Sequence, residues 1–405
     1  MAGPLHGLKV LDLSRVLAGP WAAQILADLG ADVIKVERPG AGDDTRLWGP
    51  PFVTDADGTP GDAAYFLAAN RNKRSLAVDL ASADGQAVIR RLAAQADVVL
   101  ENFKQGDLAR YGLDYATLSA EHPKLIYCSI TGFGQDGPHK HRPGYDFMIQ
   151  GMAGFMSLTG EAGGEPLRAG VAVADLTTGM YSAIAILAAL RHRDASGEGQ
   201  HVDMALFDVT FGWLANQAQN YLVGGKAPGR VGNTHPNLVP YQVFPTATKP
   251  VIVAVGNDRQ FAAFAAVLGH PEWAADSRFK LNRDRIANRD MLVALIIEAL
   301  ATQSADHWLA AIEAVGVPVG PVNDLAQAFA DPQVAARGLL VEVAHPVAGR
   351  IPTVAQPMKF SKTAPEYRSA PPLIGQHSRA VLADAGFTED EIVALESSGV
   401  VSQHP

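Results

Sequence analysis

A chain of 405 residues is too long for one ordinary hydrophobic core, and its length predicts two or three domains. Hydrophobic residues make up 48% of the chain and charged residues 19%, which is typical of a globular protein with a large buried core. The formal net charge of -9 argues against nucleic acid and against membranes as partners, so an anionic ligand would need a local basic patch.

Apolar strands alternate with amphipathic helices from residue 8 to residue 133. Strands are expected at 8–14, 32–38, 75–80, 97–103 and 124–133, and helices at 19–31, 84–96 and 106–119. This alternation implies right-handed crossovers and an α/β fold with a mostly parallel, doubly wound sheet. Ligands of such sheets bind at the carboxyl ends of the strands.

The first strand-turn-helix unit raises the question of a bound nucleotide. Glu37 ends the second strand, where a ribose-binding acid would lie. However, the turn SRVLAGPW contains one glycine, whereas the G-x-G-x-x-G fingerprint needs three. The turn therefore argues against a nicotinamide dinucleotide and leaves another nucleotide open.

Basic residues recur where strand ends are expected. Each one alone is most simply a solvated surface residue. Together at one edge of the sheet they would suit a ligand with several phosphates. The residues are Arg15, Arg38, Arg71, Lys73, Arg74 and Arg110.

The lone cysteine, Cys128, excludes an intrachain disulfide and a multi-cysteine metal site. Its surroundings, LIYCSI, are typical of a buried strand, and we expect a reducing compartment, the cytoplasm. His139 and His141 lie near Asp146 without a third His or Cys, so no metal is predicted. No signal-peptide pattern is present, and the most apolar helical stretch, 180–190, has about half the length of a membrane span.

The glycine-rich segment SITGFGQDGPHKHRPGYD follows the last of these strands. Its backbone N–H groups could meet an oxyanion or a phosphate, but an ordinary tight connection is the simpler interpretation.

A single carboxylate, Asp175, precedes an uncharged helical stretch that continues to Leu190. Aspartate is a preferred helix N-cap, and on this pattern alone capping is favoured over catalysis. Ala174 and Gly179 are small and the intervening Thr177 and Thr178 are polar, so the start of the helix could still admit a substrate atom.

The segment 221–241, rich in Gly, Pro and Asn, breaks the alternating pattern and is interpreted as a linker at the border of a second unit. After an apolar strand at 251–256 the chain is mainly helical, and it ends in a loop and two short helices. The later helices are expected at 259–268, 290–301 and 305–315.

Seven ordered motifs spread over essentially the whole chain resemble the class III CoA-transferases, a family that includes formyl-CoA:oxalate and carnitine CoA-transferases and the related α-methylacyl-CoA racemases. They are VLDLSRVLAGPWAAQILADLGADVIKVERPGAGDDTR, NRNKRS, DVVLENF, ITGFGQDGP, ADLTTG, GVPVGPVND and APPLIGQHS. The segments RPGAGDDTRLWGPPF, IYCSITGFGQ and VPYQVF resemble in particular the branch that moves CoA from succinyl-CoA to glutarate and similar dicarboxylates.

The resemblance implies a large Rossmann-like domain built from both chain ends, 1–220 and 331–405, and a small α/β domain from 221–330. It also implies a homodimer of two interlocked rings. CoA and acyl-CoA would be substrates, with no tightly bound cofactor.

The resemblance also implies roles for particular residues. Asp175 matches the family's nucleophile. Contacts with CoA are implied for Val16, Ala18, Arg38, Lys73, Arg74, Asn102, Phe103, Arg110, Phe133 and Met204. Backbone donors near Gly132 and Gln135 would stabilise charge on oxygen. The candidates for the distal carboxylate of the acceptor are Tyr145, Arg168, Arg230 and His235.

Two departures from the family matter. The consecutive glycines of the oxalate enzyme are absent, GRVGNTHPNLVPY standing instead, which argues against oxalate. The racemase branch has a histidine before an aspartate where this chain has Tyr145 and Asp146, and a tyrosine with a pKa of about 10 replaces a histidine near 6.5 poorly as an acid–base group. Transfer is therefore expected, with Asp175 ionised at pH 7 as the carrier. A racemase on the same fold and a nucleotide-binding module with Asp175 as a cap remain alternatives.

Overall fold

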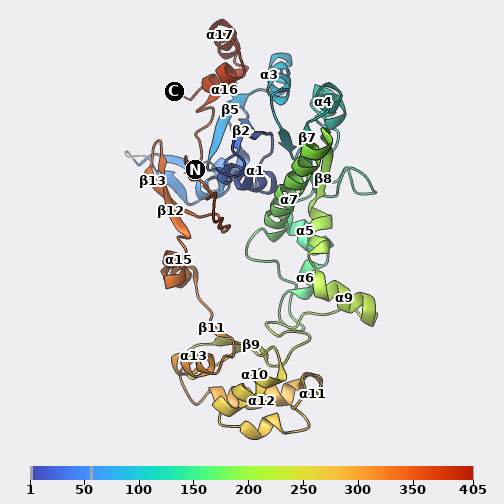
Figure 1. Ribbon diagram of the computed structural model, residues 1–405, viewed down its shortest axis with the longest axis vertical. Coiled ribbons are helices and arrows are strands. Elements are labelled where there is room, and N and C mark those ends of the chain that lie inside the picture. The colour runs from blue at the N-terminus through green and yellow to red at the C-terminus, as the bar shows by residue number, and fades with distance from the viewer. Residues whose placement is uncertain (1–2, 55–57, 405) are drawn as a thin grey trace. The chain divides into compact units, whose positions relative to one another are not determined.

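The computed structural model describes residues 3–54 and 58–404, and the chain divides into two compact units (Figure 1). The larger unit comprises Met1–Phe155, Arg168–Val223 and Ala335–Pro405, and the smaller unit comprises Met156–Leu167 and Gly224–Val334. The expected borders lie a few residues before the observed ones, but 156–167 was wrongly placed in the large domain. Arg230 donates to the Gly164 carbonyl at 2.6 Å and Gly232 N to Gly160 O at 3.0 Å, which ties this segment to the smaller unit.

In the described part of the chain, seven strands form the central sheet of the larger unit in the order β14-β5-β2-β1-β6-β7-β8. β14 is antiparallel to β5 and the other pairs are parallel, which confirms the α/β class and the mostly parallel sheet. The strands are β1 (Lys9–Asp12), β2 (Asp32–Glu37), β5 (Lys73–Val78), β6 (Val98–Glu101), β7 (Ile126–Thr131), β8 (His201–Ala205) and β14 (Val401–Ser402). From β1 the chain adds β2 and β5 on one side of the sheet, and it then adds β6, β7 and β8 on the other side. Ligands of doubly wound sheets bind at this switch point between β1 and β6.

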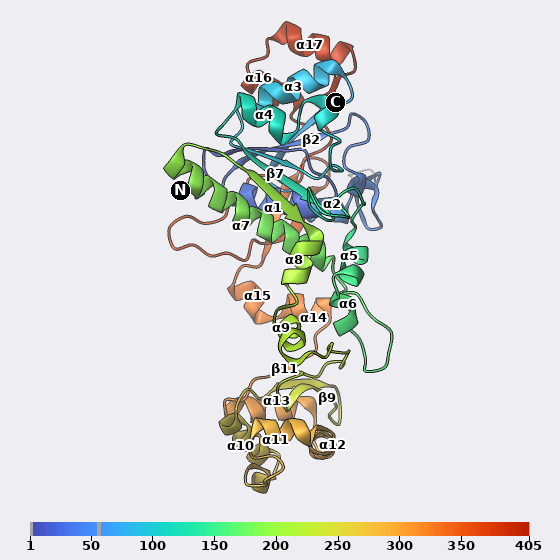
Figure 2. The ribbon, with the colours of Figure 1, turned by 90° about the vertical axis from the view of Figure 1, so that its right-hand side faces the viewer.

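Helices cover both faces of this sheet (Figure 2). In β6, Val98 and Leu100 pack into one apolar cluster and Val99 into the other, as a parallel strand buried on both faces requires. One face carries α3 (Ala83–Ala93), α4 (Tyr115–Glu121), α16 (Ser378–Asp384) and α17 (Glu389–Ser397). The other carries α1 (Ala18–Asp28), α5 (Asp146–Met152), α7 (Val173–Ser196) and α8 (Leu206–Gly212).

Helix α7 is longer than the sequence pattern indicated. It has 24 residues and begins two positions before Asp175, so its length and composition would allow it to cross a membrane. Half of its apolar window is buried, and the helix packs against α1. A Cβ on Gly179 would lie 2.6 Å from the Ala18 carbonyl oxygen, so glycine permits this crossing beside the first turn of α1.

The larger unit also contains two hairpins, β3 (Phe52–Thr54) with β4 (Pro60–Ala63) and β12 (Leu340–His345) with β13 (Gly349–Val354). Its other described helical segments are η1 (Asp44–Leu47), α2 (Ala64–Leu67) and η2 (Ala109–Tyr111). Three further helices span the borders between the units in the chain: α6 (Phe155–Leu158), α9 (Ala215–Gly224) and α15 (Pro332–Ala336).

The smaller unit has its own apolar core and, within its described residues, a three-stranded antiparallel sheet in the order β11-β10-β9. The strands are β9 (Tyr241–Phe244), β10 (Val251–Ala254) and β11 (Val319–Pro321). The helices are α10 (Asp258–Val267), η3 (Pro271–Ala274), α11 (Asn282–Ala287), α12 (Arg289–Leu300), α13 (Ala305–Ala314) and α14 (Leu325–Ala330).

Candidate active site

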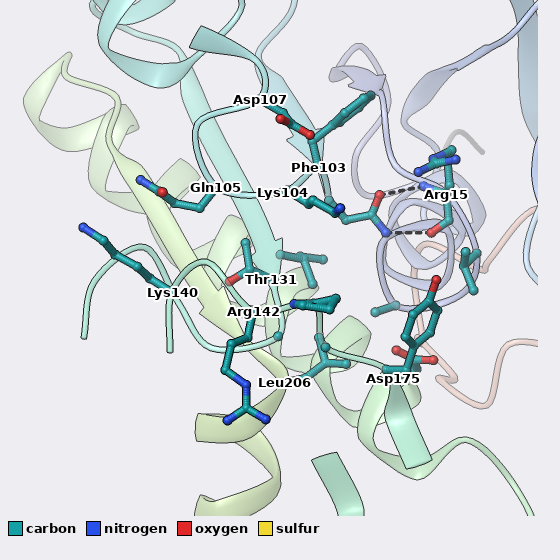
Figure 3. A pocket seen from close by; sticks show the side chains of 18 of the residues that line it. Arg15, Phe103, Lys104, Gln105, Asp107, Thr131, Lys140, Arg142, Asp175 and Leu206 are labelled. Atoms are coloured by element: carbon teal, nitrogen blue, oxygen red, sulfur yellow. Dashed lines mark hydrogen bonds between the residues drawn. The ribbon is translucent and has the colours of Figure 1, made fainter. Parts of the chain in front are cut away.

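A cavity of about 220 Å³ lies at the carboxyl ends of β1, β6 and β7 (Figure 3). It is therefore at the switch point of the sheet, between β1 and β6, where the order in which the strands are added reverses. The turn after β1, the turn after β6, the segment after β7 and the start of α7 all contribute to its wall. The predicted site residues that line it are Val16, Ala18, Asn102, Phe103, Gly132, Tyr145 and Asp175.

The turn after β1 is fixed by side chains from neighbouring elements. Asn102 Oδ1 accepts from Arg15 N at 2.9 Å, and Asn102 Nδ2 donates to Arg15 O at 2.7 Å. Val16 has a φ of 71°, which is unusual for a β-branched residue, and its N–H donates to both Asp43 carboxylate oxygens at 3.3 Å. This held turn places the start of α1, which the described side chains leave uncapped, at the cavity wall.

Two glycines allow the segment after β7 to fold back on itself. A Cβ on Gly132 would lie 2.5 Å from the Gly144 Cα, and a Cβ on Gly144 would lie 2.3 Å from the Gly132 Cα. Real Cβ atoms do not approach backbone so closely, so the crossing requires glycine at both positions. The crossing places residues 140–145, including Tyr145, at the cavity.

The backbone donors expected in this segment are partly occupied. Gly134 N donates to Thr131 Oγ1 at 2.8 Å, and Gln135 N donates to Asp203 Oδ2 at 2.9 Å. The expectation of a free donor at Gln135 is therefore wrong, because an exposed carboxylate on β8 already accepts from it.

The start of α7 is capped by Asp146 and not by Asp175. The N-cap position is Ala172, and Asp175 lies in the first turn. Asp146 Oδ2 accepts from Ala174 N at 2.7 Å and from Asp175 N at 3.3 Å. The predicted capping role of Asp175 is thus wrong, and the carboxylate of Asp175 lines the cavity (Figure 3).

Burial raises the pKa of Asp175 to about 7, and the neighbouring Asp146 carboxylate adds to the effect. The expectation of an Asp175 that is fully ionised at pH 7 therefore needs correction, since such a group is about half protonated there. The effect follows from placing two carboxylates beside each other in a partly dry site.

Tyr65 interacts electrostatically with the same two carboxylates. Burial raises the pKa of Tyr65 to about 12, and Asp175 and Asp146 contribute to the rise. Its ring meets Trp48 edge-on, with ring centroids 5.3 Å apart. The Tyr65 hydroxyl thus keeps its proton at neutral pH, and no motif or spacing in the sequence distinguished it from other tyrosines.

Basic side chains outnumber acidic ones in the cavity wall. Arg15, Lys104, Lys140 and Arg142 line it, whereas the acidic residues of the described wall are Asp107 and Asp175 (Figure 3). The excess of cations gives an acidic chain the local basic patch that an anionic ligand needs. Of these four cations, Arg15 was predicted from the sequence and the other three were not.

The Arg142 guanidinium is held by apolar groups. It lies 5.4 Å from the centre of the Phe133 ring and contacts Met152 Sδ at 3.8 Å. Such contacts orient a cation without neutralising it. Phe133 does not line the cavity, and it therefore affects the site by orienting Arg142.

A second cavity of about 280 Å³ lies at the carboxyl ends of β2 and β5, and Arg15, Phe103 and Asp107 line both cavities. Arg38 and Arg110 also line it, as predicted for this edge. The Asp44 carboxylate bridges Arg15 at 2.8 Å and Arg38 at 2.9 Å. Two adjoining cavities with shared walls suit an elongated ligand that carries several phosphates.

The basic run NRNKRS lies at the opposite edge of the sheet. β5 begins at Lys73, two residues earlier than expected, so these residues are at its amino end and their expected place at the carboxyl ends is wrong. Lys73 is 1% exposed, and its ammonium donates to Asp12, Asn70 and the Pro20 carbonyl. Arg74 pairs with Asp32 and Asp384.

The remaining predicted residues do not line the Asp175 cavity. Met204 is partly buried against the apolar cluster beneath α7. Arg168 is exposed, with its guanidinium 5.7 Å from the centre of the Phe147 ring. Arg230 and His235 belong to the smaller unit. Among residues 3–54 and 58–404, no group of three His, Cys, Asp or Glu side chains is arranged to hold a metal ion.

The family model described as CoA-transferase family III matches residues 5–378. A succinate–glutarate CoA-transferase of Agrobacterium fabrum is 53% identical over 94% of this chain and 95% of its own. A succinyl-CoA:glutarate CoA-transferase of Homo sapiens is 43% identical over 99% of this chain and 90% of its own.

A solved structure has the same fold. The crystal structure of a CAIB/BAIF family protein from Brucella suis matches with a TM-score of 0.84 and 51% sequence identity, and covers 95% of this chain and 100% of that one.

Proposed function

Because the chain belongs to CoA-transferase family III and so transfers CoA between carboxylic acids, we propose that it moves CoA from succinyl-CoA to a short dicarboxylate such as glutarate, with Asp175 as the carrier. The role of Asp175 is supported by the arrangement at the start of α7. Asp146 accepts the capping hydrogen bonds from the backbone, and the Asp175 carboxylate lines the cavity.

The proposed chemistry uses one carboxylate twice. An Asp175 oxygen attacks the thioester carbonyl of succinyl-CoA and the C–S bond breaks. CoA thiolate departs, and a mixed anhydride of succinate and Asp175 remains. The thiolate attacks the aspartyl carbonyl, succinate leaves, and an aspartyl-CoA thioester remains. The acceptor carboxylate then attacks this thioester, and the same two steps in reverse release the new acyl-CoA and the Asp175 carboxylate.

The first step is uphill because thiolate is the poorer leaving group. The usual pKa values in water, about 8.5 for a thiol and about 3.9 for a carboxylic acid, differ by an amount that corresponds to roughly 6 kcal/mol. Binding of the distant nucleotide end of CoA is the natural source of the compensating energy. The Tyr65 hydroxyl and the uncapped start of α1 are the donors proposed to stabilise charge that develops on oxygen.

The two adjoining cavities suggest how CoA lies. We assign the phosphate end to the cavity of Arg38 and Arg110, and the thioester end to the Asp175 cavity, with Arg15 and Phe103 between them. The backbone of Val16 and Ala18 then contributes to the wall along the chain of CoA.

The proposed acceptor is a dicarboxylate because the succinyl group of the donor and the acceptor acid occupy the same position in turn. The cations that bind the distal carboxylate of succinate would then also bind a distal carboxylate of the acceptor. Lys140, Arg142 and Tyr145 line that wall on the side of the segment after β7. The racemase alternative is not favoured, since the relatives compared above are named CoA-transferases and the histidine of the racemase branch is Tyr145 here.

A homodimer is also proposed, interlocked as the resemblance implies. Helix α7 exposes Met180, Tyr181 and Ile184, with exposed fractions of 44%, 48% and 61%, which suits coverage by a second copy. A cytoplasmic location is proposed as well, because the chain has a single cysteine, the buried Cys128, and so uses no intrachain disulfide.

The proposal is tested by a mass-spectrometric acceptor screen. The protein is incubated with succinyl-CoA and a panel of mono- and dicarboxylates, and new acyl-CoA species are measured. Glutaryl-CoA should form, and Asp175→Asn should abolish it while CoA binding is largely kept. If no new acyl-CoA forms with any dicarboxylate, the donor and acceptor assignment is wrong.

A further inference from the structure

A row of polar side chains crosses the ends of three neighbouring strands outside the Asp175 cavity. Glu101 of β6 pairs in register with Ser129 of β7, and Ser129 pairs with Asp203 of β8. Glu101 and Ser129 are 5% and 3% exposed. Such groups are costly to bury unless they make hydrogen bonds that the fold needs.

The two ends of this row hold the segments that border the cavity. Glu101 Oε2 accepts from Phe103 N at 2.7 Å, so the carboxylate closes the turn after β6. At the other end, Asp203 accepts from Gln135 N at 2.9 Å in the segment after β7. Neither carboxylate lines the cavity itself.

The middle of the row supports Glu101. The Ser129 side chain acts on Glu101 against the rise in pKa that burial causes, and Ser129 Oγ lies 2.9 Å from His201 Nε2. The His201 ring is stacked on Tyr115 at 4.8 Å, which fixes its position.

Two turns depend on Glu101. Phe103 N is bonded to Glu101 directly, while Asn102, between them, clamps the turn after β1 through both groups of its amide. Movement of the turn after β6 would therefore move Arg15 as well. Both turns line the shared wall of the two cavities proposed for CoA.

We propose that Glu101 is a positioning residue for CoA: its carboxylate holds the Asn102–Phe103 turn, and through Asn102 the turn after β1, in the shape that accepts CoA. This inference rests on the proposed function. It requires that the loss of Glu101 acts on CoA binding and leaves the acceptor acid and the chemical steps largely unaffected.

The test compares Glu101→Ala with a conservative variant and a matched control. Burial raises the pKa of Glu101 to about 7, so Glu101→Gln, which keeps an acceptor oxygen, resembles a form that is populated near neutrality. Asp114→Asn is the control. Asp114 lines a neighbouring cavity together with Glu101 and accepts from Thr117 Oγ1 at 2.6 Å.

The dissociation constant of CoA is measured by titration calorimetry, and KM is measured for succinyl-CoA and for glutarate. Glu101→Ala is expected to weaken CoA binding about tenfold, which is about 1.4 kcal/mol, and to raise the KM for succinyl-CoA alike. The KM for glutarate and kcat should stay within about twofold. Glu101→Gln should recover most of the affinity, and Asp114→Asn should match the native protein.

Unchanged CoA affinity in Glu101→Ala would overturn the inference, as would an equal loss in Asp114→Asn or a change confined to glutarate. Should Glu101→Ala not fold, Ser129→Ala replaces it, with an expected loss of about threefold, and no loss counts against the inference. Failure of the native protein to bind CoA at all would instead overturn the proposed function, and this inference with it.

Discussion

The pH dependence of transfer tests the pairing of Asp175 with Asp146. A rise in the pKa of Asp175 from 3.8 to about 7 corresponds to about 4 kcal/mol, at 1.36 kcal/mol per pKa unit. Only the ionised carboxylate attacks a thioester. A group with a pKa of about 7 is about one-tenth ionised at pH 6 and about nine-tenths ionised at pH 8, so kcat/KM for succinyl-CoA should rise roughly tenfold across this interval.

Replacement of Asp146 by asparagine isolates the cause. The asparagine oxygen can still accept from Ala174 N, but the negative charge beside Asp175 is gone. The pKa of Asp175 should then fall, and the midpoint of the kcat/KM profile should move to lower pH. A phosphate group of CoA also titrates near pH 6, but its contribution to the pH profile is the same for the native protein and for Asp146→Asn.

The assay is the initial rate of glutaryl-CoA formation at subsaturating succinyl-CoA between pH 5.5 and 9, for the native protein and Asp146→Asn. Asp324→Asn is a matched control, because Asp324 caps a helix of the smaller unit. A flat profile between pH 6 and pH 8 in the native protein would refute the raised pKa. A midpoint that does not move in Asp146→Asn would refute the part assigned to Asp146.

Three further predictions concern single substitutions. Asp175→Asn should increase the free energy of unfolding at pH 8 by up to about 4 kcal/mol in denaturant titrations. Because the pKa of Asp175 is higher in the folded state than in the unfolded state, the stability of the native protein falls as pH rises from 3.8 toward 7, and the amide removes this cost. A variant less stable than the native protein at pH 8 would contradict the prediction. Tyr65→Phe should lower kcat about tenfold with little change in KM, and an unchanged kcat would exclude the hydroxyl from the chemistry. Gly132→Ala should abolish transfer because its Cβ would meet Gly144, and full activity would show that the two segments can separate without cost.

The sheet could be predicted because its strands are buried on both faces. Runs such as Val98 to Leu100 have no polar interruption, and turns or helices separate them at regular intervals. β8 was missed although its sequence, HVDMA, alternates polar and apolar residues as a half-buried strand does, because five residues repeat the pattern too few times to stand out. The beginning of β5 was missed because Lys73 is charged, and its burial as the ion-pair partner of Asp12 has no local signal.

The candidate site was predictable only in part. Asp175 could be selected from its motif, but its capping partner could not, because Asp146 is 29 positions earlier and reaches α7 through the fold. The same holds for Tyr65, which approaches Asp175 from the short helix α2. The approach of Asp146 to α7 follows the crossing of segments at Gly132 and Gly144, which has no local signature.

The way this acidic chain provides for an anionic substrate follows from where its carboxylates point. Asp43, Asp146 and Glu101 accept from backbone N–H groups of the turns around the cavity, so part of the negative charge is used to hold backbone in place. The cations on the wall, Lys140 and Arg142 among them, are the groups that we propose bind substrate. Asp146 and Glu101 should therefore be replaceable by amides, which keep an acceptor, with a much smaller loss than by alanine. Asp43 should not, because its carboxylate also neutralises the buried Lys35 ammonium at 2.9 Å. The cations should respond in the opposite way, since the loss of their charge is the loss of their role.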